Sequence, residues 1–360
     1  MRYCWIILPL TLLSLACSPA GPPGNEACGA ALRATSDPEP SLAVGTEIVM
    51  GFYNVENLFD TLDDPANPGD NWVIEEPAIG FAEGNYRIKL QNLAKAIASI
   101  EGQGPDLLGL AEVENACVIA DLIAQPPLAT RGYRLVHEES NDHRGIDVAL
   151  MYDPEYFAYR SHFTRRVDFS DPDYTGRDIL VVEGLVNGET IYVLVNHWPS
   201  RSGGQQESEP RRIAAAQAVR QVVDELNEQA PEAGLVIMGD FNDDPADPSL
   251  TQVLQAQLTY PEAMGKPGIY NLFAPLHDPE REGSLTYRGR YNLFDQVLLN
   301  EDLLDGAGAL GYVSSSATIH HPDFMRFRGG GPSRSIHRGE FKDYGFSDHF
   351  PVYLKLEVQP

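Results

Sequence analysis

The sequence predicts an α+β domain in which two mixed β-sheets pack against each other and helices cover the outside. Three observations support this prediction. Most apolar segments are short runs bounded by turn-forming residues, which is typical of strands. Two longer segments repeat apolar residues at helical spacing. Asn187-Gly188, between two alternating segments, is a strong hairpin signal. Strands mixed with fewer helices favour layered packing around one core.

Nine segments are predicted to form strands. Asp178–Val186 and Glu189–His197 flank Asn187-Gly188 and should pair as a hairpin. The other seven are short apolar or alternating runs, in chain order Glu47–Tyr53, Asp106–Glu112, Arg134–Glu138, Asp147–Tyr152, Leu235–Gly239, Asp295–Asn300 and Phe350–Val358.

Two segments, Tyr86–Ile100 and Arg211–Glu228, are predicted to form amphipathic helices. In the first, Leu90, Leu93 and Ile97 share one face, and the second repeats apolar residues in the same way. Such a stripe has to be buried, so both helices should pack against a sheet.

The first residues are predicted to be a secretory signal rather than part of the fold. Residues 1–16 begin with Met1-Arg2 and continue as an uncharged apolar stretch too short to span a bilayer. Residues 13–17 (LSLAC) resemble the lipobox of bacterial lipoproteins, in which case Cys17 becomes the acylated first residue. The alternative is ordinary cleavage near Ala16 or Ala20. A lipid on Cys17 would tether the protein to a membrane without spanning it.

Residues 17–44 are rich in Pro, Gly, Ala and Ser and are predicted to be a flexible stalk. Residues 45–360 show no composition break, internal repeat or long linker, and are predicted to be one domain. The expected location is the bacterial cell envelope through the lipid anchor, and otherwise the periplasm or the medium. Export would place Cys28 and Cys117 in an oxidising compartment, where they either form a disulfide or stay free.

The composition excludes several classes of protein. With 52 Asp and Glu against 26 Lys and Arg, the formal charge is −26, which argues against a module that grips nucleic acid through a broad basic face. A 43% share of hydrophobic residues excludes a disordered acidic tail. The mean hydropathy of −0.25 excludes a polytopic membrane protein. Acidity does not exclude a phosphorylated substrate held by a metal.

Polar side chains stand next to several predicted strands, at positions where a strand does not need them. They are Asn54, Glu56, Glu112, Asn196, His197, Asp240, Asn242, Asp295, Asp348 and His349. A single Asp at a strand end usually forms a turn or a cap. Repeated use of carboxylates, Asn and His at six strand ends predicts one site at a shared sheet edge.

The chemistry of this set is restrictive. Oxygen ligands without cysteine suit Mg²⁺, Mn²⁺ or Ca²⁺, and Mg²⁺ usually takes one or two carboxylates plus water and phosphate oxygens. Histidines beside aspartates are suited to proton transfer near neutral pH. Metal, base and acid together predict hydrolysis of a phosphate ester, in which the metal polarises the phosphoryl oxygen.

Seven segments contain these residues and their flanking strands. They are GFYNVENLFD (51–60), DLLGLAEVEN (106–115), RGIDVALMY (144–152), VNHWPSRSGG (195–204), GDFNDDP (239–245), FDQVLL (294–299) and SDHFPV (347–352). In this order they resemble the DNase I-like endonuclease/exonuclease/phosphatase superfamily. NVENLFD and NHWPSRSGG are most similar to its exported bacterial branch, described as predicted extracellular nucleases. The resemblance implies a four-layered α/β sandwich with the site at one edge of the packed sheets.

The resemblance also implies roles for individual residues. Glu112 would be the principal metal ligand, with Asn54 holding the metal shell or the phosphate and Asp348 contributing to the metal region. Mg²⁺ is the implied cofactor, with Mn²⁺ or Ca²⁺ as alternatives.

For the chemical step, Asp240 would orient or deprotonate the attacking water, and Asn242 would donate to a non-bridging oxygen. His349, paired with Asp295, would act as general base or transition-state donor, so two candidates for the base stay open. His197 matches the general acid of the DNase I-like and sphingomyelinase branches.

Several further residues border these motifs. Glu56 is either structural or supports the metal, and Asp147 is expected to be the buried partner of a site residue. Arg144 is expected to contact the phosphate. Basic residues that include Arg334 and Arg338 lie in a glycine-rich stretch before Asp348, where they either hold an anionic substrate or are ordinary surface residues.

A second basic cluster, Arg201, Arg211 and Arg212, follows His197.

The expected function is that of an exported Mg²⁺-dependent phosphodiesterase, foremost a nuclease acting on extracellular or periplasmic DNA or RNA. The alternatives are a phosphatase or phospholipase C-like enzyme acting on lipid head groups, sugar phosphates or inositol phosphates, and a non-catalytic surface lipoprotein. No protein partner is implied.

Overall fold

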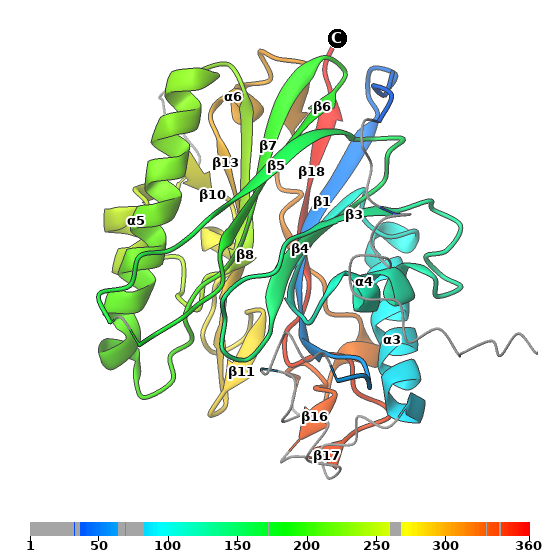
Figure 1. Cartoon of the computed structure of the whole chain (residues 1–360). Helices are drawn as coiled ribbons and strands as arrows, with labels where there is room; N and C mark the ends of the chain where they lie inside the picture. The colour runs from blue at the N-terminus through cyan, green and yellow to red at the C-terminus, as the bar shows by residue number, and fades with distance from the viewer. Residues whose placement is uncertain are drawn as a thin grey trace, which may run out of the picture.

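Two β-sheets lie face to face between helices in the computed structural model of the chain (Figure 1). The structure describes residues 32, 37–63, 69, 83–171, 173–259, 268–328, 330–337 and 340–360. The predicted signal segment, Cys17 and Cys28 lie outside these residues. None of the described helices combines the length and the apolar character that crossing a membrane requires.

The first sheet has the strand order β14-β18-β1-β2-β4-β3, with β15 beside β18. β1 is parallel to β2 and antiparallel to β18, so the sheet is mixed. Its strands are β1 (Glu47–Leu58), β2 (Leu107–Val113), β3 (Arg134–His137), β4 (Asp147–Tyr152), β14 (Leu310–Tyr312), β15 (Thr318–Ile319) and β18 (Val352–Val358).

The second sheet has the order β5-β6-β7-β8-β13-β10-β9. β7 and β8 are parallel, and β13 returns antiparallel to β8. Its strands are β5 (Ala158–Arg165), β6 (Ile179–Val186), β7 (Glu189–His197), β8 (Gly234–Asp240), β9 (Ala256–Gln257), β10 (Ile269–Asn271) and β13 (Asp295–Asn300). β6 and β7 form the hairpin that Asn187-Gly188 predicted.

Helices form the two outer layers (Figure 1). α5 (Gln205–Gln229) covers the second sheet, and its buried apolar residues share a core cluster with β7, β8 and β13. α3 (Glu83–Ala98) and α4 (Ala116–Ile123) cover the first sheet. The remaining elements are short: η2 (Ile100–Gly102), η3 (Ser249–Val253), η4 (Ala274–Leu276), α6 (Asp302–Asp305), η5 (Asp323–Met325), and the hairpins β11 (Leu285–Tyr287) with β12 (Arg290–Asn292) and β16 (Ile336–His337) with β17 (Glu340–Phe341).

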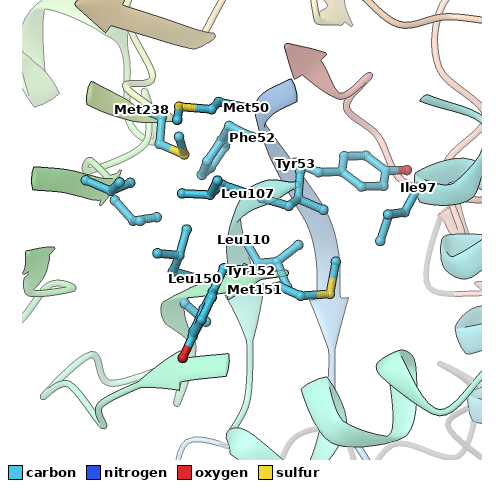
Figure 2. Packing of buried hydrophobic residues seen from close by; sticks show 14 of the residues in the cluster. Met50, Phe52, Tyr53, Ile97, Leu107, Leu110, Leu150, Met151, Tyr152 and Met238 are labelled. Atoms are coloured by element: carbon cyan, nitrogen blue, oxygen red, sulfur yellow. The ribbon is translucent and has the colours of Figure 1, made fainter. Parts of the chain in front are cut away.

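The main core lies on both faces of the first sheet. Figure 2 shows Met50 and Phe52 of β1 directed toward Met238 of the second sheet, while the next residue, Tyr53, points to Ile97 of α3. This alternation is the two-residue period of a strand. A Cβ atom on Gly109 of β2 would lie 2.6 Å from the sulfur of Met238, so only glycine lets the sheets approach this closely here.

The predicted fold class is confirmed, and all nine predicted strands and both predicted helices are present. α5 begins at Gln205, before the predicted Arg211, and contains Pro210. The short apolar segment 116–123 forms α4, which the sequence did not predict; Asn115 caps it by accepting from the N–H groups of Cys117 and Val118. Cys117 is disulfide-bonded. Because Cys28 lies outside the described residues, their pairing stays a prediction.

Candidate active site

The predicted polar residues meet at one edge of the sandwich because of strand direction. β7 and β8 are parallel and end together at His197 and Asp240, which are register partners. β13 runs the other way and begins at Asp295, the partner of Asp240. In the facing sheet, β1 reaches the same end, and His349 lies just before β18, which pairs antiparallel with β1.

Five side chains form a continuous series across this edge. His197 Nε2 lies 3.9 Å from Glu112 Oε1 and 3.6 Å from Asp240 Oδ2. The same oxygen of Asp240 lies 3.8 Å from His349 Nε2, which lies 3.9 Å from Asp348 Oδ1. The two histidines lie next to strand ends of different sheets and flank one aspartate, so residues distant in sequence meet at this edge.

The backbone is locally irregular where it presents these side chains. Glu56, Asn57, Glu112 and Asn242 all have left-handed φ angles, between 50° and 62°. The register of β2 with both of its neighbours shifts around Glu112. Such bulges redirect a side chain out of the regular strand pattern. Non-glycine residues adopt this conformation at a cost, and such residues often cluster at functional sites.

His349 is held by a short hydrogen bond between its Nδ1 and Asp295 Oδ2, 2.6 Å long. Both residues are buried. Burial alone would lower the pKa of His349, but the negative charges of Asp295 and Asp240 outweigh it and raise the pKa well above 6.5. The imidazole therefore keeps its Nε2 directed at Asp240 and its positive charge at neutral pH.

His197 shows the opposite behaviour, although it faces the same aspartate. Its Nδ1 is buried and has no hydrogen-bond partner among the described residues. Burial lowers its pKa well below 6.5, and the positive charges of Arg177 and Arg144 lower it further. Arg177 also donates to the backbone oxygens of His197 and Trp198, at 3.1 and 2.7 Å. His197 is therefore neutral in the free protein.

Asp240 lies between the two histidines and is almost completely buried. Burial raises its pKa to about 7, which the charge of His349 opposes and that of Asp295 reinforces. Asn54 Nδ2 donates to Asp240 Oδ2 at 3.0 Å, and the N–H of Asn242 donates to Oδ1 at 2.9 Å. The side-chain amide of Asn242 donates to the oxygen of Trp198. Asp240 is thus fixed in place and able to exchange a proton near neutral pH.

The donors near Glu112 fit a hard divalent cation. The Glu112 carboxylate accepts from the N–H of Asn57 at 2.9 Å and from Arg144 Nη2 at 3.2 Å, and 13% of the side chain is exposed. Asn54 and Asp348 lie at the same edge; the amide oxygen of Asn54 accepts from the N–H of Glu56 at 3.0 Å, and Asp348 adds a carboxylate. Oxygen ligands of this kind suit Mg²⁺, Mn²⁺ and Ca²⁺.

Two other groups offer potential metal ligands within 4.8 Å of one another: Asp240, Asp295 and His349, and separately His137, Glu139 and Asp147. In the first group, the short bond from His349 to Asp295 and the positive charge of the imidazole favour proton exchange over metal binding. In the second, Asp147 Oδ2 lies 3.2 Å from His137 Nε2. Asp147 is buried, but it pairs with His137 and accepts from the N–H of Ser140 at 2.8 Å. Neither residue belongs to the site, so the prediction that Asp147 supports a site residue was wrong.

The arginines that were expected to bind substrate have acidic partners. Arg144 contacts Glu112, and Arg334 bridges Glu56 and Asp348, with distances of 3.3 and 2.6 Å. Both therefore lie at the site, and the Arg334 side chain is 48% exposed. Arg338 lies outside the described residues.

The contacts of Glu56 show that its role is structural. Its Oε2 accepts from the N–H and hydroxyl of Ser335, at 2.6 and 2.8 Å, and Lys89 Nζ donates to the same hydroxyl at 2.6 Å. Glu56 and Lys89 are both buried. Burial raises the pKa of Glu56 to about 7 and lowers that of Lys89 to about 8. This group, the Lys89 network, ties α3 to the segment that carries Arg334.

Arg201 and Arg212 point inward rather than toward substrate. Arg212 is fully buried and its Nε lies 2.7 Å from Asp243 Oδ1. Arg201 pairs with Asp243 and Asp247 and donates from Nε to the backbone oxygen of Asn242 at 2.9 Å. These residues form the Arg212 network, which supports the turn after Asp240. Arg211 lies at the surface, over the ring of Tyr174.

Two supporting residues were missed by the sequence analysis. Arg177 follows no motif, and nothing in its local pattern singles it out. Ser347 accepts from the N–H of His349 at 3.1 Å and donates to the backbone oxygen of Asn54 at 2.6 Å, so it joins the two strand ends. Its place at the start of the SDHFPV motif was a usable signal.

The model of the endonuclease/exonuclease/phosphatase family matches residues 49–358, which contain every described residue of this site. The chain belongs to the endonuclease/exonuclease/phosphatase family. Enzymes of this family are phosphoester hydrolases that depend on divalent metals, and the present protein is such a hydrolase. No curated protein sequence matches the chain.

Solved structures of the family share the fold at low sequence identity. D. rerio TDP2 in complex with a single-strand DNA product is 16% identical, with a TM-score of 0.53 over 87% of this chain and 100% of that one. ANGEL2, a 2′,3′-cyclic phosphatase, is 13% identical, with a TM-score of 0.55 over 88% and 97%. An endonuclease/exonuclease/phosphatase from Bacteroides vulgatus is 14% identical, with a TM-score of 0.50 over 87% and 100%.

Proposed function

We propose that this protein is an exported, Mg²⁺-dependent phosphodiesterase that hydrolyses DNA or RNA outside the cytoplasm. The observation that carries the proposal is the placement of His197 and His349 on either side of buried Asp240, with Glu112 and Asp348 at the two ends of the series. This arrangement offers an acid, a base and metal ligands around one point, which is what cleavage of a phosphodiester requires.

Each side chain has a role in the proposed hydrolysis. Asp240 and His349 are 3.8 Å apart and exchange protons as a pair, so together they take the proton of the attacking water. The water oxygen bonds to phosphorus as the ester bond on the opposite side breaks. His197 gives a proton to the leaving oxygen; a bound phosphate favours its protonated form because opposite charge raises the pKa of a histidine. Asn242 donates to a non-bridging oxygen.

Glu112, Asn54 and Asp348 are the residues that would hold Mg²⁺. The ion supplies Lewis-acid polarisation of the phosphoryl oxygen and neutralises charge that develops in the transition state. Arg144 stays close to Glu112 and is directed at the same edge, where it contacts a substrate phosphate.

Two observations favour a nucleic acid over other phosphate esters. The motifs around Asn54 and His197 are most similar to those of predicted extracellular nucleases. A structure with the same fold, TDP2, was solved with a single-strand DNA product. Export rests on residues 1–16 and on the lipobox-like residues before Cys17. A lipid on Cys17 would tether the protein to the cell envelope.

A substrate panel tests the proposal. Full-length protein is incubated with single- and double-stranded DNA, RNA, a 2′,3′-cyclic nucleotide, sphingomyelin, inositol phosphates and bis-p-nitrophenyl phosphate, with EDTA or with Mg²⁺, Mn²⁺ or Ca²⁺. We expect cleavage of nucleic acid with Mg²⁺ and none with EDTA. Hydrolysis confined to lipids, inositol phosphates or the cyclic nucleotide would move the protein to the phosphatase or phospholipase class.

Substitutions in the site test the assigned roles. His197→Ala and Asp240→Asn should each lower kcat for the nucleic acid that the wild-type protein cleaves by about 10²–10⁴-fold, the usual contribution of a positioned acid or base. His162→Ala is the matched control, because His162 lies on the outer strand β5 and pairs with Glu138. Wild-type kcat in either site variant would show that the chemistry lies elsewhere.

A further inference from the structure

Large exposed aromatic side chains are concentrated next to the candidate active site. Of the seven large hydrophobic residues that are exposed in the described part of the chain, four lie on the β11–β12 hairpin, in η5 and on the segment between η5 and β18. They are Tyr287 (61% exposed), Phe324 (37%), Phe327 (49%) and Tyr344 (53%). All four are aromatic.

The hairpin is fixed directly to catalytic residues. Leu285 at its start forms a bridge with His349, and the hydroxyl oxygen of the preceding Ser284 accepts from the N–H of Asp295 at 3.1 Å. The backbone oxygen of Ser284 accepts from the N–H of Phe350 at 2.7 Å. Tyr287 at the end of β11 thus lies two residues after Leu285, which forms the bridge with His349.

The second segment is fixed to the same edge. Phe327 and Gly331 close a turn through a 2.8 Å backbone hydrogen bond. A Cβ atom on Gly331 would lie 2.4 Å from Thr286 of β11, so the turn packs against the hairpin. The rings of Phe327 and Tyr344 are nearly parallel, at 12° with 6.3 Å between their centroids. Figure 1 shows β11 and the β16–β17 hairpin at the same end of the sandwich.

The charge of these segments is opposite to that of the chain. Residues 283–292 contain two arginines and residues 324–338 contain four, and neither stretch contains an acidic residue, although the chain has a formal charge of −26. Arg288 lies 5.1 Å from the centre of the Tyr287 ring. Within the described residues, neither Arg288 nor Arg328 pairs with a carboxylate, so both remain available for phosphate.

We propose that Tyr287, Phe327 and Tyr344, with Arg288 and Arg328, bind the unpaired bases and phosphates of a single-stranded nucleic acid next to the active site. Bases stack on exposed aromatic rings regardless of sequence, and arginines contact the backbone. A base within a duplex is already stacked and cannot use such rings. This inference rests on the proposed function and adds to it the form of nucleic acid that is bound.

Binding is measured on an Asp240→Asn background of the full chain with Mg²⁺, so that bound strands are not cut. The probe is a fluorescent single-stranded DNA 12-mer, and the variant carries Tyr287→Ala, Phe327→Ala and Tyr344→Ala together. We expect its Kd to rise about tenfold or more, since one stacked base contributes about 1–3 kcal/mol. Phe163→Ala, at an exposed aromatic residue on β5, is the matched control and should leave the Kd unchanged.

Activity on a small substrate separates this inference from the proposed function. In a second version of the triple variant, Asp240 is retained. This version should hydrolyse bis-p-nitrophenyl phosphate at the wild-type rate, which also shows that it folds. An unchanged Kd for the 12-mer, or an equal loss for a duplex of the same length, overturns the inference. Binding of the surface to anionic vesicles in place of the 12-mer overturns it as well. Hydrolysis of the small ester by wild-type protein without cleavage of any nucleic acid refutes the proposed function itself.

Discussion

Two buried ionic networks support the candidate active site from opposite sheets, and they differ in the residues they use. The Arg212 network lies behind the strand end of Asp240 and pairs Arg201 and Arg212 with Asp243 and Asp247. The Lys89 network lies behind Asn54 and links Lys89, Ser335 and Glu56. Arginine stays charged at any pH that a protein tolerates, whereas a buried lysine loses its proton readily.

The difference indicates two ways of holding a catalytic loop. In the Arg212 network, fixed charges hold one another in place, and the site depends on both partners being present. In the Lys89 network, burial has brought the pKa of Glu56 up to about 7 and that of Lys89 down to about 8. The pair can therefore relieve an unbalanced charge by moving or releasing a proton, so it should tolerate the loss of a partner better.

Removing one arginine should have the largest effect. Arg212→Met leaves Asp243 buried with a reduced set of partners, and we expect a loss of about 3–5 kcal/mol in the free energy of unfolding, the usual result of breaking a buried ion pair. Chemical denaturation at pH 7 measures it. Arg165→Met, which removes a surface pair with Glu225, is the control and should cost less than about 1 kcal/mol. A similar loss of unfolding free energy in both variants would show that the buried ion pair of Arg212 stabilises the protein no more than a surface ion pair does.

The pH dependence of stability should separate the two networks. The pKa of Lys89 is lower in the folded chain, at about 8, than its ordinary 10.5, so the folded state binds fewer protons between these values. The free energy of unfolding should then rise by about 3 kcal/mol from pH 8 to pH 10.5, and that gain is lost as the pH falls through 8. Lys89→Met should lack the rise and Arg212→Met should keep it. A rise that persists in Lys89→Met would remove Lys89 as its source.

Removing Lys89 at neutral pH should have the smallest effect. Glu56 keeps its hydrogen bonds from the N–H and hydroxyl of Ser335 and can take up a proton, so Lys89→Met should cost about 1–3 kcal/mol, as for one buried polar group losing a partner. Chemical denaturation of Lys89→Met and Arg212→Met under the same conditions compares their free energies of unfolding. If Lys89→Met proved the more damaging of the two, the proposed difference between the networks would be wrong.

Motif residues were predictable from the sequence because they stand at strand ends. Asp240, Asp295 and His349 were identified in this way, and the structure brings them within 4.8 Å of one another. Supporting residues were harder to identify. Arg177 and Lys89 lie in segments with no motif, and their role follows from burial beside His197 and Glu56, which only the folded chain creates.

The direction of arginine side chains was not predictable at all. Arg201 and Arg212 follow His197 in a basic cluster, yet they turn toward Asp243 and away from the surface. Conversely, Arg288 attracts no attention in the sequence, and only the folded chain shows it 5.1 Å from the centre of the exposed Tyr287 ring. Sequence shows that a charge is present, while its partner depends on which segments pack together.

The sequence by itself determined the strand pattern, the acidic composition and the set of residues able to perform phosphoester chemistry, because alternation and strand-end residues are local properties. The tertiary structure decided how those residues differ from one another. His197 and His349 are the same residue type facing the same aspartate, at 3.6 and 3.8 Å. Burial lowers the pKa of both, but the charges of Asp295 and Asp240 reverse this shift at His349, whereas those of Arg177 and Arg144 add to it at His197. Such long-range charge and burial arise only when distant segments meet.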